Sequence, residues 1–127
     1  MPRVLLPAGA ATVRLTTPDG RVLCDRCAVA RSWPQRLRGL LGTPAPAPGE
    51  GLLLPRCASV HTVGMRHAIE VVFLDGDGGI LAVVPELRPG RAAGRRRARA
   101  VVEAAPGSCG RARIGPGDRL VAVDRVV

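Results

Sequence analysis

The densest group of chemically active side chains lies between residues 57 and 67, where a thiol, hydroxyls and two imidazoles follow one another closely. Cys57 and His61 are the residue types of a thiol nucleophile and its base, with Glu70 as a group that orients the imidazole. Such chemistry needs the thiol and the imidazole in hydrogen-bond contact. Nothing in the spacing enforces that contact, so thiol catalysis is an alternative and not our main expectation.

The same segment is better explained as a strand-to-strand crossover that shapes a pocket. In this interpretation Gly64 allows a backbone bend, and Met65 fills part of the core. The side chains that we expect to line the pocket are Cys57, Ser59, His61, Thr62, Met65, Arg66 and Glu70. We therefore expect a non-enzymatic binding or scaffold domain, and the sequence identifies no catalytic residue.

Cys24 and Cys27 have the Cys-x-x-Cys spacing of a zinc knuckle or a redox pair. A structural zinc site usually needs a second pair of ligands, and the chain has no second Cys-x-x-Cys. Two unrelated thiols beside a strand end are the simpler interpretation. Cys109 is interpreted as a small residue in a turn. The sequence therefore predicts no metal site and no cofactor, with zinc at Cys24 and Cys27 as a weak alternative.

The chain carries nineteen Arg and no Lys against ten acids, for a formal charge of +9. A GC-rich genome explains Arg in place of Lys, but it does not explain the excess over acids. Part of this excess is concentrated between residues 88 and 99, at Arg88, Arg91, Arg95, Arg96, Arg97 and Arg99. This cluster indicates an anionic ligand or nucleic acid as a second possible partner. A solvated loop that only keeps the protein soluble is the remaining alternative.

The length of 127 residues fits a single domain over 1–127, large enough to form its own core. That core must be aliphatic, because the chain has one Phe, one Trp and no Tyr. The apolar run at the N-terminus is broken at Pro7, so we expect no signal peptide. No stretch approaches the ~20 apolar residues that span a bilayer. We expect a basic, cytoplasmic, bacterial protein with reduced thiols and no membrane partner.

The elements expected to position these residues are mostly hairpins. Residues 12–16 and 21–24 flank a Pro-Asp-Gly turn, and residues 69–75 and 80–84 flank a Gly-rich turn. The second pair is apolar on both faces, which predicts two central strands. A short strand is expected at 27–30, before a helix at 33–41 that begins after Ser32 and ends at Gly42.

The remaining segments alternate between strands and loops. Residues 43–51 contain three Pro and are expected to form a surface loop, followed by a buried strand at 52–54. Residues 85–97 are expected to form an exposed loop, and 98–104 a strand. Turns at 106–107 and 115–118 precede a last strand at 119–126.

Motifs spread along the chain resemble those of the family named domain of unknown function 192, a small bacterial and archaeal β-domain. The residues that carry the resemblance are 36–42, 51–54, 59–66, 69–75, Gly78, Ile80, Val83, Val102, Glu103, Gly107, Ile114, Gly117 and Asp118. The resemblance implies a compact, partly open β-barrel with one helix, and no activity.

The chain departs from the family pattern in the middle motif. His61-Thr62-Val63-Gly64-Met65 stands where the family usually has an aromatic-Met-Lys-Asn-Thr run. Ala68 replaces the usual Pro, and Glu70 replaces the usual Asp. If that motif marks a pocket in the family, the longer carboxylate implies different contacts in this protein.

Overall fold

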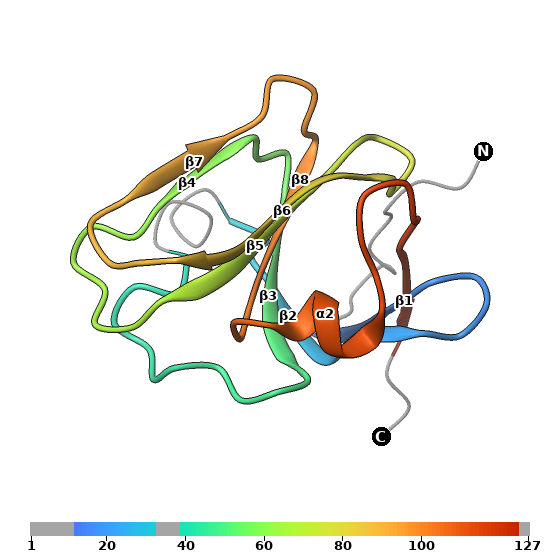
Figure 1. Ribbon diagram of the computed structural model, residues 1–127, viewed down its shortest axis with the longest axis horizontal. Coiled ribbons are helices and arrows are strands. Elements are labelled where there is room, and N and C mark those ends of the chain that lie inside the picture. The colour runs from blue at the N-terminus through green and yellow to red at the C-terminus, as the bar shows by residue number, and fades with distance from the viewer. Residues whose placement is uncertain (1–11, 33–38, 125–127) are drawn as a thin grey trace.

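A computed structural model describes residues 12–32 and 39–124 and is mainly β (Figure 1). Its strands are β1 (Thr12–Thr16), β2 (Val22–Val29), β3 (Glu50–Pro55), β4 (Ser59–His61), β5 (Ile69–Leu74), β6 (Ile80–Leu87), β7 (Ala92–Gly94), β8 (Ala100–Ala104) and β9 (Val121–Asp124). The described residues contain one helix, α2 (Ser108–Ala112). The prediction of a mainly β fold with one short helix is therefore confirmed.

Seven strands form one mixed sheet in the order β6-β5-β8-β3-β2-β1-β9, and β4 pairs separately with β7. β2 and β3 are parallel, whereas the other neighbours in the sheet are antiparallel. The two edges meet at a single bridge between Gly79 and Arg119. A barrel needs a continuous ladder between its first and last strands. The described strands form a large mixed sheet and no closed barrel, and the partly open barrel stays a prediction.

Both predicted hairpins are present, although the second lies elsewhere in the sheet than expected. The β1–β2 turn contains Gly20, whose φ of 95° favours glycine. In the β5–β6 turn, the carboxylate of Asp75 accepts the N–H groups of Asp77 and Gly79, each at 2.8 Å. All six residues of β5 are buried, but β6 is an edge strand. The prediction that both strands are central was therefore wrong for β6.

The segment 85–97 is not a continuous loop, because β6 extends to Leu87 and β7 covers Ala92–Gly94. Pro85 lies within β6, where the edge position leaves its missing N–H without a required partner. The 57–65 segment, which was expected to be only a crossover between strands, contains the short strand β4. The strand predicted at 27–30 is largely the continuation of β2, which runs unbroken from Val22 to Val29.

Most of the helix predicted at 33–41 falls on residues 33–38, which lie outside the described residues. Residues 39–42 form turns, and Gly39 and Gly42 have φ values of 56° and 80°. The observed helix α2 was not predicted, and it places Cys109 in a helix instead of a turn. Its N-cap, Gly107, provides no side-chain cap, and Gly110 lies inside it, so the usual sequence signals of a helix are missing.

Two apolar clusters lie on opposite faces of the large sheet. The first includes Leu53, Val72 and Val102 from the sheet, together with Cys109 of α2. The second includes Leu54, Val71 and Val101, and residues of β4 and β7 pack against it. In Figure 1, α2 and the β4–β7 pair accordingly lie on either side of the central strands.

None of the helical segments in the described part of the chain has the length and apolar character needed to cross a membrane. Location in the cytoplasm stays a prediction.

Candidate functional site

Thr62 joins the 57–65 segment to the turn that carries the first arginines of the 88–99 cluster. Its side chain is fully buried. The hydroxyl donates a hydrogen bond to the carbonyl of Arg88 and accepts the N–H of Arg91 at 2.9 Å. The Thr62 backbone N–H donates to the Arg91 carbonyl at 2.8 Å, and its carbonyl accepts the N–H of Gly90 at 3.0 Å. Thr62 was expected to face a ligand, but its polar groups are committed to holding this turn.

The short β4–β7 ladder continues this attachment. Val60 pairs with Ala93, and both side chains pack against the second apolar cluster. At the far end of the ladder, the N–H of Arg95 donates to the carbonyl of Ala58 at 2.9 Å. The 57–65 segment is therefore a support for β7 and for the turns at both ends of β7.

The proposed thiol and imidazole have separate partners. The Cys57 thiol donates to the carbonyl of Ser59 at 3.1 Å, and Cys57 packs against the second apolar cluster. The His61 side chain is exposed, and its Nδ1 accepts the N–H of Val63 at 3.3 Å. No hydrogen bond joins Cys57 to His61 in the part of the chain that the structure describes. Ser59 is exposed beside them on β4.

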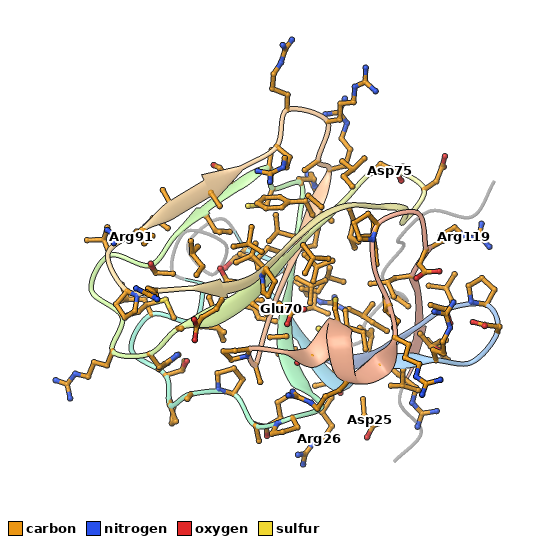
Figure 2. The ribbon with its side chains drawn as sticks, viewed as in Figure 1. Asp25, Arg26, Glu70, Asp75, Arg91 and Arg119 are labelled. Atoms are coloured by element: carbon orange, nitrogen blue, oxygen red, sulfur yellow. The ribbon has the colours of Figure 1, made fainter. Side chains whose placement is uncertain are left out.

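Glu70 lies on the opposite face of the sheet from β4. It is fully buried, and its Oε2 accepts the backbone N–H of Cys109 at 3.0 Å. Burial and the nearby Glu70 carboxyl raise the pKa of the Cys109 thiol. The second carboxylate oxygen of Glu70 has no partner among the described residues. Figure 2 shows Glu70 in the interior, near α2. Glu70 therefore anchors α2 and does not orient His61.

Two further side chains that were expected to line the pocket also lie in different environments. Met65 is buried in the second apolar cluster, whereas Arg66 is exposed. The side chains predicted to line one pocket thus point to different surroundings.

A cavity of about 190 Å³ lies elsewhere, between β2, the end of the 43–49 loop and α2. Its lining includes Leu23, Asp25 and Arg111. Sequence reasoning missed this cavity, since it depends on the unpredicted helix.

Cys24 and Cys27 lie together in the first apolar cluster, and both are fully buried. Hydrogen bonding to Cys24 and burial raise the pKa of the Cys27 thiol. The Cys24 thiol also donates to the carbonyl of Gly49 at 3.4 Å. Within residues 12–32 and 39–124, no group of three His, Cys, Asp or Glu side chains is placed to hold a metal ion. Cys24 and Cys27 are therefore thiols packed in the core, and no third metal ligand lies beside them among the described residues.

The arginines of the 88–99 cluster are all exposed, and they fall into two turns at the two ends of β7. Arg88 and Arg91 belong to the turn that Thr62 holds, whereas Arg95, Arg96, Arg97 and Arg99 follow β7. The Arg95 guanidinium lies 5.3 Å from the ring centroid of Phe73, a cation–π contact. We call residues 88–99, with their six arginines, the arginine ribbon.

The ion pairs of the described residues lie away from the arginine ribbon, although Arg99 lies beside the β5–β6 turn that carries Asp75 and Asp77. The ion pairs between described residues join Arg14 to Asp25, Arg21 to Asp19 and Asp118, and Arg26 to Glu50. No arginine of the ribbon has such a partner among the described residues, and Glu86 is the acid that precedes the ribbon in sequence. Figure 2 shows Arg91 projecting on the far side of the molecule from Asp25 and Arg26. The ribbon therefore carries six arginines without an ion pair among the described residues, in excess over the neighbouring acids Asp75, Asp77 and Glu86.

Glu103 is a second buried carboxyl group that sequence reasoning did not single out as a site residue. It lies in β8, on the sheet face opposite Glu70, and accepts the N–H of Leu40 at 3.1 Å. Burial raises the pKa of Glu103 to about 7. A Cβ atom at Gly39 would lie 2.9 Å from Glu103 Oε1, so this approach requires glycine. The signal available in the sequence was a lone acid inside an apolar strand.

The DUF192 family profile, which describes uncharacterized proteins, matches residues 14–122. The chain belongs to the DUF192 family. The resemblance seen in the sequence motifs is thereby confirmed. No protein with curated annotation matches the chain.

Two solved structures share the fold of this DUF192 protein over nearly its whole length. A "putative transcription regulator" from Sinorhizobium meliloti 1021 is 25% identical, with a TM-score of 0.77, and the match covers 92% of this chain and 98% of that one. A protein of unknown function from Novosphingobium aromaticivorans DSM 12444 is 20% identical, with a TM-score of 0.74, covering 94% and 92%.

Proposed function

We propose that this DUF192 protein is a binding module that uses the arginine ribbon to hold a polyanionic partner. One observation carries the proposal: six exposed arginines occupy twelve consecutive residues, and none of them is ion-paired with an acid among the described residues, as Arg14, Arg21 and Arg26 are. A surface with excess positive charge attracts anions and raises their local concentration.

The name of the Sinorhizobium meliloti relative, a "putative transcription regulator", supports an anionic partner of this kind. A small-molecule pocket beside residues 57–70 is less well supported. Of its expected lining, Thr62, Met65 and Glu70 are buried and bonded or packed within the fold. In the present proposal the same segment acts as the support of the ribbon.

The proposal predicts binding that weakens steeply with salt, because each neutralised phosphate releases a counterion. The test is a fluorescence anisotropy titration of inorganic polyphosphate, heparin and a DNA duplex at two ionic strengths. With up to six contacts to a duplex, affinity is expected to fall about 1000-fold between 50 and 200 mM salt. Absence of binding to all three polyanions at low salt, or binding that salt does not change, contradicts the proposal.

A pair of triple variants separates the ribbon from total charge. Arg91→Gln, Arg96→Gln and Arg97→Gln remove three charges from the ribbon, and we expect the magnitude of the logarithmic salt slope to fall by about 3 on a duplex. The matched control, Arg14→Gln, Arg26→Gln and Arg113→Gln, removes the same charge elsewhere. Equal losses in both variants would show that net charge, and not the ribbon, drives binding.

A further inference from the structure

We infer that the partner of the arginine ribbon is the phosphate backbone of double-stranded nucleic acid, bound without sequence preference. This inference rests on the proposed function and names its class of partner. It depends on how the guanidinium groups are distributed, on which side chains are absent from the ribbon, and on how rigidly its two turns are held.

The arginines are divided between two turns and do not converge on one point. Arg91 and Arg95 are four residues apart across the extended strand β7, which places their Cα atoms roughly 13 Å apart at about 3.3 Å per residue. A single small anion contacts both turns only if their side chains converge on it. Two rows of phosphates are contacted without such convergence, because the major groove of a duplex is about 12 Å wide. The distribution therefore favours a polymer with charges on both sides of a groove.

The ribbon has no aromatic side chain on which an unpaired base could stack. The chain contains no Tyr, and its single Phe, Phe73, is fully buried beneath Arg95. Trp33 lies outside the described residues. Proteins that hold single strands depend on stacking of bases on aromatic rings. An arginine surface that lacks such rings is suited to a duplex, whose bases are already stacked with one another.

Sequence-specific contacts in the major groove also have little support from the side chains present. Asn is absent from the chain, and Gln35 is its only Gln, so the usual bidentate partners of adenine are missing from the ribbon. Arginine can contact guanine as well as phosphate. Six arginines without another base-reading group indicate contacts that position a protein on the backbone and carry little sequence information.

Hydrogen bonds hold both turns against β4, so the arginines start from a fixed framework. Thr62 holds the first turn with its hydroxyl and its backbone groups, and the carbonyl of Ala58 holds Arg95. The β4–β7 ladder lies between these anchors. A preformed framework loses less conformational entropy on binding, which favours a rigid and regular partner such as a duplex.

The test compares fluorescently labelled 20-bp duplexes with single strands of the same length at 100 mM salt, using the full chain. We expect the duplex to bind at least 10-fold more tightly than either of its strands. Two duplexes of unrelated sequence are expected to bind within about 3-fold of each other. The triple variant Arg91→Gln, Arg96→Gln and Arg97→Gln should remove most of the duplex binding, whereas Arg14→Gln, Arg26→Gln and Arg113→Gln should retain most of it.

Four outcomes would overturn the inference. Single strands that bind as tightly as the duplex would show that a stacked double helix is not required. Tighter binding to heparin, to polyphosphate or to vesicles containing anionic lipid would assign the ribbon to another polyanion and leave the proposed function standing. Preference for one duplex sequence by more than 10-fold would show that the ribbon reads bases. Failure to bind any of these probes would remove the proposed function as well.

Discussion

At the scale of single residues, the two buried glutamates show how burial decides the role of a carboxyl group. Glu70 and Glu103 lie on neighbouring strands but on opposite faces of the sheet. Each accepts a backbone N–H, from Cys109 and from Leu40 respectively. Neither has an ion-pair partner among the described residues. Both groups therefore anchor neighbouring backbone to the sheet, and neither belongs to a surface site.

Ionisation of Glu103 makes the stability of the protein depend on pH. The unfolded carboxyl group ionises near the ordinary value of 4.5, whereas burial raises the folded pKa to about 7. Between these values the folded protein binds more protons, so the free energy of unfolding falls as pH rises, by about 3 kcal/mol in total. Glu103→Gln keeps an oxygen acceptor for Leu40 without an ionisable group. Urea unfolding at pH 5 and at pH 8 measures the free energy of unfolding. We expect the decrease between these two pH values to be much smaller in the variant than in the unchanged protein.

The exposed acid Glu86 provides the control for this prediction. Glu86→Gln removes one acid from the protein surface and should keep the decrease in stability that Glu103 causes. If Glu103→Gln retains the full decrease between pH 5 and pH 8, the burial of Glu103 is not its origin.

At the scale of elements, the β4–β7 pair depends on one buried side chain as much as on its own short ladder. Each strand has three residues, and an isolated pair of strands is marginal in water. Thr62 adds three hydroxyl hydrogen bonds to the turn before β7, and Val60 and Ala93 add apolar packing. The arginine ribbon therefore takes its shape from contacts outside its own sequence.

Thr62→Val removes the hydrogen bonds of the hydroxyl to Arg88 and Arg91 while keeping a branched side chain of similar size. Because the part-buried hydrogen bonds to Arg88 and Arg91 are lost, we expect the free energy of unfolding to fall by about 1 kcal/mol. Polyanion affinity should also fall several-fold, since the first arginine turn loses its anchor. Chemical denaturation and the anisotropy titration described above measure these two effects.

Two variants test whether the Thr62 hydroxyl itself is responsible. Thr62→Ser keeps the hydroxyl and should restore most of the affinity. Ser59→Ala removes an exposed hydroxyl from the neighbouring strand and should change neither quantity. Affinity that is unchanged in Thr62→Val would show that the turn keeps its shape without this anchor.

At the scale of the whole molecule, the central strands are covered on both faces and the ribbon is not. All residues of β5 and β8 are buried, because the first apolar cluster, which includes Cys109 of α2, covers one face of these strands and the second cluster, with the β4–β7 pair, covers the other. In β7 the first and last residues are exposed. Stability is therefore expected to be distributed unevenly through the fold.

Native-state hydrogen exchange measures this distribution directly. We expect the amides of β5 and β8 to exchange only through global unfolding, since their ladders lie inside the sheet. Amides of β7 should exchange through local opening with a lower free energy. Equal protection of β7 and β8 would show that the ribbon opens only with the whole sheet. A shift of β7 toward slower exchange on adding a DNA duplex would support the proposed binding surface.

Much of the fold follows from the sequence by itself. The apolar run at 69–74 predicted a fully buried strand, and the Gly-rich segment after it predicted the hairpin. The Pro-rich segment 43–51 predicted a loop, since proline removes the donors that a ladder needs, although β3 already begins at Glu50. These features depend on local chemistry, which a linear pattern records. The same holds for the exposure of the six arginines, because isolated charges are rarely buried.

What only the tertiary structure decided is which residues share a surface. Residues 57–65 and 88–99 appeared as separate hypotheses, but the β4–β7 ladder and Thr62 join them into one unit. Glu70 appeared beside His61 in sequence, yet strand alternation turns it to the other face. α2 has no capping signal and forms because Cys109 packs against the sheet and bonds to Glu70. Contacts between distant segments decide all three, and no local pattern encodes them.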